Sequence, residues 1–123
     1  MIRGLLPGIR VLELDQGISG PYCGKIFAQM GAEVIKVEPI EGDYSRGMGP
    51  FPNDIPHPEK SGLYLALNFN KFGVTIDLST TSGIQQLMDM VPTVDIMIAN
   101  FLPGSMISLD PDRIRDCNPE IIL

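Results

Sequence analysis

The segment from residue 9 to residue 38 constrains the fold most, because its hydrophobic pattern changes period twice. Residues 9–14 alternate as a short strand, residues 22–30 read as a helix, and residues 32–38 form a β-branched run that ends at Pro39. A strand, a helix and a strand in this order form a βαβ unit, whose two strands are parallel. The pattern therefore predicts the α/β class, with a mostly parallel sheet and flanking helices.

The helix of this unit carries its own start and stop signals. Ser19 suits the N-cap position, and Gly31 suits the position just after the last helical residue. The spacing of Phe27 and Met30, with Cys23 one turn earlier, predicts that these side chains share one apolar face.

The rest of the chain continues as short elements joined by turns. We expect a short helix at residues 63–67, a strand at 74–78, a helix capped by Thr80 or Thr81, a buried strand at 95–101, and a helix from Asp110 to Cys117. Residues 40–59 are rich in proline and glycine and show no periodicity, and a loop this long inside a domain is typically functional or disordered. Residues 120–123 resemble the first half of another buried strand.

Composition excludes several classes of function. The 123 residues suffice for one domain, and 44% hydrophobic with 20% charged residues is typical of a globular protein. The net charge of −6 without a basic patch argues against nucleic acid as a partner. The apolar part of the first ten residues is too short for a signal peptide, so we expect a cytoplasmic protein without a membrane segment. Cys23 and Cys117 fit no metal-binding spacing, so we interpret them as reduced structural thiols and expect no metal site.

Ligands of open α/β sheets bind beyond the carboxyl ends of the strands. Three stretches are expected there: residues 15–21, 39–46 and 100–104. The first is a glycine-containing turn before a helix, whose free N–H groups could hold a phosphate or a thioester carbonyl. The alternative is an ordinary tight turn, because Gly17 and Gly20 do not form the dinucleotide-binding fingerprint.

Single residues add little chemistry. His57, the only histidine, lies in the proline-rich loop with no evident catalytic partner, and we expect it at the surface. Lys71 is expected to be solvated, or alternatively to contact a phosphate. The aspartates near strand ends suit turn capping, and their spacing singles out no nucleophile: Asp15, Asp43, Asp77 and Asp95.

Four segments, in order and spacing, resemble the family III CoA-transferases, the CaiB/BaiF family, which includes formyl-CoA transferase and the α-methylacyl-CoA racemases. They are LPGIRVLEL at 6–14, SGPY at 19–22, GAEVIKVEP at 31–39 with Gly42-Asp43 and Arg46, and a run from NFNK at 68–71 and IDL at 76–78 to Asp95, Asn100-Phe101, Pro103-Gly104 and Asn118-Pro119. Together they cover nearly the whole chain.

The resemblance implies that residues 1–123 are the truncated N-terminal part of a Rossmann-like large domain in a longer chain that forms an interlocked homodimer. It implies coenzyme A as the ligand, brought as an acyl-CoA substrate, with a carboxylic acid as the second substrate. By residue-by-residue match, the implied CoA-binding positions are Ile18, Ser19, Ile76, Ser79, Asn100, Phe101 and Leu102. The chain departs from the family where some members carry basic side chains, at Pro39, Ser79 and Ser108.

The resemblance also implies that the catalytic aspartate lies downstream of the Asn118-Pro119 segment, beyond Leu123, so we assign no catalytic residue within the chain. The leading hypothesis is the N-terminal portion of a CoA-transferase. One alternative is a fragment of an acyl-CoA racemase or isomerase, and a second is a CoA-binding or interaction module without catalysis. An apolar end at residues 121–123 predicts an exposed hydrophobic patch, and with it aggregation or dependence on a partner.

Overall fold

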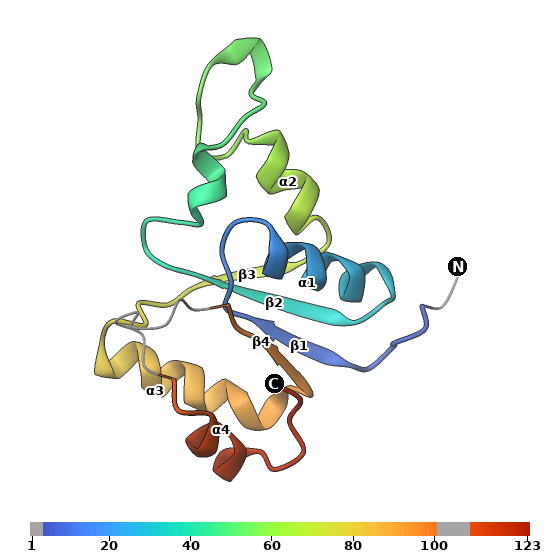
Figure 1. Ribbon diagram of the computed structural model, residues 1–123, viewed down its shortest axis with the longest axis vertical. Helices are drawn as coiled ribbons and strands as arrows, with labels where there is room; N and C mark the ends of the chain where they lie inside the picture. The colour runs from blue at the N-terminus through green and yellow to red at the C-terminus, as the bar shows by residue number, and fades with distance from the viewer. Residues whose placement is uncertain (1–3, 101–108) are drawn as a thin grey trace.

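The computed structural model describes residues 4–100 and 109–123, and it confirms the α/β class (Figure 1). The strands are β1 (Arg10–Glu13), β2 (Glu33–Glu38), β3 (Phe72–Thr75) and β4 (Ile96–Ile98). The helices are α1 (Ser19–Gln29), α2 (Gly62–Asn68), α3 (Thr81–Met90) and α4 (Pro111–Cys117), with short 3-10 turns η1 (Tyr44–Gly47), η2 (Pro52–Asp54) and η3 (Val91–Thr93). All four strands are parallel, in the order β3-β2-β1-β4.

The sheet lies between two helical layers, with α1 and α2 on one face and α3 and α4 on the other (Figure 1). Because side chains alternate along a strand, β1 sends Leu12 toward the α3 side and Val11 toward α1. The larger apolar core is on the α3 side, where Leu12 and Ile35 pack in one cluster with Leu87. The α1 side holds a smaller apolar cluster and, as described below, most of the buried charge.

Helix α1 presents its small residues to the sheet, and of the predicted apolar face of Phe27, Met30 and Cys23 only Phe27 packs against the core. Gly20 and Gly24 are buried, whereas Met30 and Cys23 are exposed. A Cβ at Gly24 would lie 1.8 Å from Glu13 Oε2. The helix therefore rests directly on buried polar side chains of β1, which leaves no room for larger residues.

The prediction of Ser19 as the N-cap is wrong. Ser19 is the first helical residue, and the preceding Ile18 makes no side-chain cap hydrogen bond. Two other caps are confirmed: Thr80 Oγ1 accepts from the N–H of Gly83 at 3.0 Å, and Asp110 accepts from the N–H of Asp112.

The prediction that residues 120–123 enter the sheet is confirmed at one position. Ile122 forms a parallel bridge with Ile96, and the N–H of Met97 donates to the carbonyl of Ile122 at 2.9 Å. Ile122 and Leu123 are 62% and 45% exposed, as the predicted apolar patch requires. The predicted strand at 74–78 begins and ends earlier, as β3.

Candidate functional site

The strand order places a topological switch point between β1 and β4. The chain leaves β1 toward β2 on one side, and the later strand β4 pairs on the other side. Open α/β sheets bind ligands in the crevice at such a point. Here Asn100 Nδ2 donates to Ser19 Oγ at 2.9 Å, linking the segment after β4 to the start of α1. The fold thus brings together two of the positions that the resemblance implies for CoA.

Two further implied positions, Ile76 and Ser79, line one cavity of about 250 Å³. Its wall also includes Gln16 and Pro39, so it lies along the carboxyl ends of β1, β2 and β3. Ser79 Oγ donates to Asp77 Oδ1 at 2.5 Å, and hydrogen bonds from Ser79 lower the pKa of Asp77.

Of the remaining implied positions, only Ile18 lies within the described residues. Ile18 is 53% exposed at the rim of the switch point, next to Ser19. Three positions named above lie outside the described residues: Phe101, Leu102 and Ser108.

The glycine turn before α1 is already occupied by carboxylates of the chain itself. Gly17 has a φ of +84°, a conformation that favours glycine, and its N–H donates to Asp43 Oδ1 at 3.0 Å. The carboxyl of Asp15 lies against Gly20, where a Cβ would come within 1.9 Å of Oδ2. These contacts leave fewer free donors for a phosphate than the sequence suggested.

Asp15 is the most perturbed carboxyl at this edge. It is 1% exposed, and neither side-chain oxygen has a hydrogen-bond partner. Burial, followed by repulsion from Glu13, raises the pKa of Asp15 to about 6, and the charges of Lys36 and Lys71 oppose this shift only partly. Asp15 therefore changes protonation close to physiological pH.

Beneath α1, two lysines and two carboxylates form a buried ion network. Lys36 Nζ lies 3.1 Å from Glu13 Oε1 and 2.9 Å from Asp43 Oδ2, and it donates to the carbonyl of Asp15 at 2.8 Å. Lys71 Nζ lies 2.7 Å from Glu13 Oε2, and the Lys71 side chain is 2% exposed. The expectation of a solvated Lys71 is therefore wrong, because the side chain crosses under α1 to neutralise Glu13.

Sequence reasoning missed this network, although a signal was present. Glu13 and Lys36 stand next to the apolar runs Val11-Leu12 and Val34-Ile35, and strands in the middle of a parallel sheet are buried on both faces. A charged residue at such a position requires a buried partner.

A second polar group surrounds Glu38 at the end of β2. Arg46 donates from Nε to Glu38 Oε2 and from Nη2 to Glu38 Oε1, each at 2.8 Å, and the Tyr64 hydroxyl also donates to Glu38. Burial alone would raise the pKa of Glu38, but the hydrogen bonds from Arg46 and Tyr64 lower it to about 2. The guanidinium also lies 3.8 Å from the centroid of the Tyr64 ring. This group anchors the irregular loop to the sheet.

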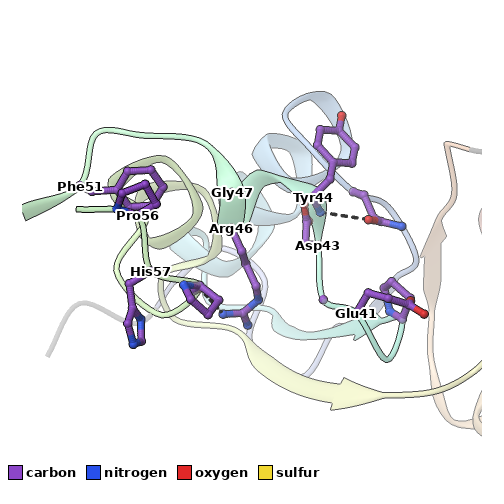
Figure 2. Close-up of a pocket in the computed structure, with 12 residues that line it drawn as sticks. Glu41, Asp43, Tyr44, Arg46, Gly47, Phe51, Pro56 and His57 are labelled. Atoms are coloured by element: carbon purple, nitrogen blue, oxygen red, sulfur yellow. Dashed lines mark hydrogen bonds between the residues drawn. The ribbon is translucent and has the colours of Figure 1, made fainter. Parts of the chain in front are cut away.

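The loop at 40–59 borders an open cavity of about 650 Å³ beside this anchor. Figure 2 shows Phe51, Pro56 and His57 on one side of it and Glu41 and Tyr44 on the other. The predicted loop is confirmed, and it contains two 3-10 turns. The cavity beside it has the volume of a small-molecule site.

The histidine and the two cysteines lie at the surface. His57 is exposed in the loop, as predicted. Cys23 and Cys117 are free and exposed. Within residues 4–100 and 109–123, no three His, Cys, Asp or Glu side chains gather as metal ligands, and no helix has the length and apolar character needed to cross a membrane.

Comparison with known proteins decides the family. Residues 6–123 match the family described as CoA-transferase family III. The chain belongs to this family. It is 35% identical over 121 residues to the succinyl-CoA:mesaconate CoA-transferase of Haloarcula hispanica, covering 97% of this chain and 31% of that protein. It is 37% identical over 120 residues to the probable fatty acyl-CoA transferase Rv3272 of Mycobacterium tuberculosis, covering 95% of this chain and 30% of that protein.

Solved structures agree with this assignment. The crystal structure of Rv3272 aligns with a TM-score of 0.82 and 36% identity, over 97% of this chain and 32% of that one. A CaiB/BaiF family protein from Brucella suis aligns with a TM-score of 0.85 and 31% identity, over 98% of this chain and 32% of that one. The predicted family is confirmed, and the chain spans less than a third of the length of these relatives.

Proposed function

We propose that the protein carrying this chain is a CoA-transferase, which moves CoA between an acyl-CoA thioester and a carboxylic acid. Residues 1–123 would form the N-terminal part of its large domain. The observation that carries the proposal is the Asn100–Ser19 hydrogen bond at the switch point between β1 and β4. It joins two family CoA positions at the edge where α/β sheets bind their ligands.

In this proposal the chain binds and orients CoA. The backbone at Ile18 and Ser19 approaches the bound CoA, Asn100 with Phe101 and Leu102 holds the nucleotide end, and the cavity at residues 76–79 gives a third contact. Support comes from the exposure of Ile18 and from the cavity wall that Ile76 and Ser79 share.

The nucleophile of the transfer is placed outside this chain, beyond Leu123. The carboxylates buried near the switch point do not suit that role, because a nucleophile must reach the thioester carbon. Glu13 and Asp15 are 0% and 1% exposed and lie under α1. We also propose, from the family resemblance, that the complete protein works as an interlocked homodimer in the cytoplasm.

Two alternative functions give different results in one experiment. The complete protein is incubated in D₂O with an acyl-CoA and a second carboxylic acid, and the products are followed by mass spectrometry. A new thioester supports the transferase, whereas deuterium on the α-carbon without CoA exchange indicates a racemase or isomerase. CoA binding with neither reaction indicates a binding module.

The CoA site is tested separately with two alanine variants and a matched control. Asn100→Ala and Ser19→Ala should each weaken CoA binding about tenfold, because each removes the Asn100–Ser19 hydrogen bond that holds the two proposed CoA-binding segments together. Ser82→Ala is the control, since Ser82 is also an exposed serine in the first turn of a helix. Equal affinities for all of these variants and the parent would place CoA elsewhere.

A further inference from the structure

The cavity of about 650 Å³ at the 40–59 loop has largely apolar walls. Its lining includes Pro39, Phe51, Pro56 and Pro58. The cavity lies beyond the carboxyl end of β2 and shares Gln16, Pro39 and Glu41 with the 250 Å³ cavity at residues 76–79. A ligand bound along this edge could therefore extend into it.

Arg46 is the only arginine or lysine among the described residues of the lining, and its donors are all used. A guanidinium has five N–H groups. The Nε and one Nη2 donor go to Glu38, and the other Nη2 donor goes to the Tyr64 hydroxyl at 2.8 Å. The two Nη1 donors go to the carbonyl of Pro58 and to Glu59 Oε1, at 3.2 and 3.3 Å. Arg46 therefore has no N–H left for a bound anion.

The other polar groups of the lining also disfavour an anion. Glu41 is an exposed carboxylate at the wall, and Asp43 is held by Lys36 and by backbone N–H groups. His57 Nδ1 accepts from the N–H of Glu59 at 3.1 Å, so its ring can offer a ligand only the single N–H of Nε2. A carboxylate placed here would lie near like charge without a paired cation.

We propose that this cavity receives the acyl group of the thioester, and that it selects an uncharged, apolar acyl group over one that ends in a carboxylate. The proposal rests on the proposed function, because it assumes CoA at the adjacent edge. It goes further by assigning a substrate class from the lining alone. The phosphates of CoA do not suit the cavity for the same electrostatic reason that excludes an acidic acyl end.

The test compares two thioesters of equal chain length, butyryl-CoA and succinyl-CoA, with free CoA, by calorimetric titration of the protein that carries this chain. Butyryl-CoA should bind about tenfold more tightly than CoA, because its apolar carbons leave water. Succinyl-CoA should bind no more tightly than CoA. Equal affinities for the two thioesters, or tighter binding of succinyl-CoA, would overturn the proposal.

Two variants test whether the preference for butyryl-CoA arises in this cavity. Phe51→Ala should remove most of the advantage of butyryl-CoA while CoA affinity is retained. Glu41→Lys adds a cation at the wall and should narrow the preference for butyryl-CoA over succinyl-CoA about fivefold. Glu120→Lys, the same charge change at an exposed residue outside the lining, should leave that preference unchanged. If CoA itself does not bind, the proposed function fails; if CoA binds but neither variant alters the preference, only the acyl assignment fails.

Discussion

The buried ion network under α1 gives the sharpest prediction on stability. Lys71 Nζ and Glu13 Oε2 are 2.7 Å apart, with side chains 2% and 0% exposed. Lys71→Met removes one cation from a buried group in which two ammonium groups already face three carboxylates, those of Glu13, Asp15 and Asp43. Removing one partner of a buried pair costs about 3–5 kcal/mol, because the other charge stays buried without compensation.

The double variant Glu13→Gln with Lys71→Met removes one charge of each sign. Lys36 then keeps Asp43 and the carbonyl of Asp15 as partners. We expect the double variant to be more stable than Lys71→Met alone. Together with the single variant Glu13→Gln, it should give a coupling energy of about 1–3 kcal/mol for the Glu13–Lys71 pair.

Urea unfolding followed by circular dichroism at pH 7.5 measures these differences. Lys60→Met is the matched control, since Lys60 is exposed and forms no ion pair within the described residues, and it should change stability by less than about 0.5 kcal/mol. The reasoning is refuted if Lys71→Met matches this control, or if the effects of the Glu13 and Lys71 substitutions simply add.

Three further predictions follow from neighbouring residues. The pKa of Asp15 rises from 3.8 in the unfolded chain to about 6 in the folded protein. Between these pH values the folded state binds more protons than the unfolded state. The free energy of unfolding should therefore fall by up to about 3 kcal/mol as the pH rises from 3.8 to 6. Asp15→Asn should abolish this fall between pH 4 and pH 7 in urea titrations, and an unchanged slope would contradict the burial argument. Gly24→Ala should lower stability by about 1–3 kcal/mol despite the better helix propensity of alanine, because its Cβ would meet Glu13 at 1.8 Å. Gly73→Ala, with open space around its Cβ, serves as control in thermal melts, and equal melting temperatures would argue against the close packing. Folding lowers the pKa of Glu38 from 4.5 to about 2, so its ion pair stabilises the fold above pH 4.5 and is lost as the pH falls toward 2. In Glu38→Gln, stability should therefore depend less on pH in acid unfolding than in the parent. Identical acid unfolding curves for the variant and the parent would exclude this contribution.

Local pattern was sufficient to predict the framework of the sheet. The period change across residues 9–38 predicted β1, α1 and β2 and their parallel pairing, since these depend on neighbours in the sequence. Thr80 and Asp110 were recognisable as caps for the same reason. The strand near residue 75 was placed too late, because apolar alternation continues into Ile76 and Leu78 after the sheet pairing with β2 has ended.

The polar interior depends on contacts that sequence spacing does not show. Lys71 donates to the carbonyl of Pro21, fifty residues away, at 2.8 Å. The orientation of α1 follows from this network, because Gly24 lies against the carboxylate of Glu13 in β1 and Gly20 against that of Asp15, just after β1. Hydrophobic spacing alone therefore predicted the existence of α1 and the packing of Phe27, but not that Gly20 and Gly24 face the sheet.

The same network explains how the proposed CoA site would have to work. Asp15 and Asp43 occupy the inner side of the turn before α1, so a polyanionic ligand meets negative charge there and loses the donor of Gly17. It must then be held from the outer rim, where Ser19 and Asn100 are exposed and joined by a hydrogen bond. Bringing phosphates close to Asp15 would raise the pKa of that carboxyl further. CoA binding should therefore take up protons near pH 6, and calorimetry in two buffers of different ionisation enthalpy measures this uptake directly. Absence of uptake in the parent protein, or uptake that persists in Asp15→Asn, would exclude Asp15 as the group that takes up the proton.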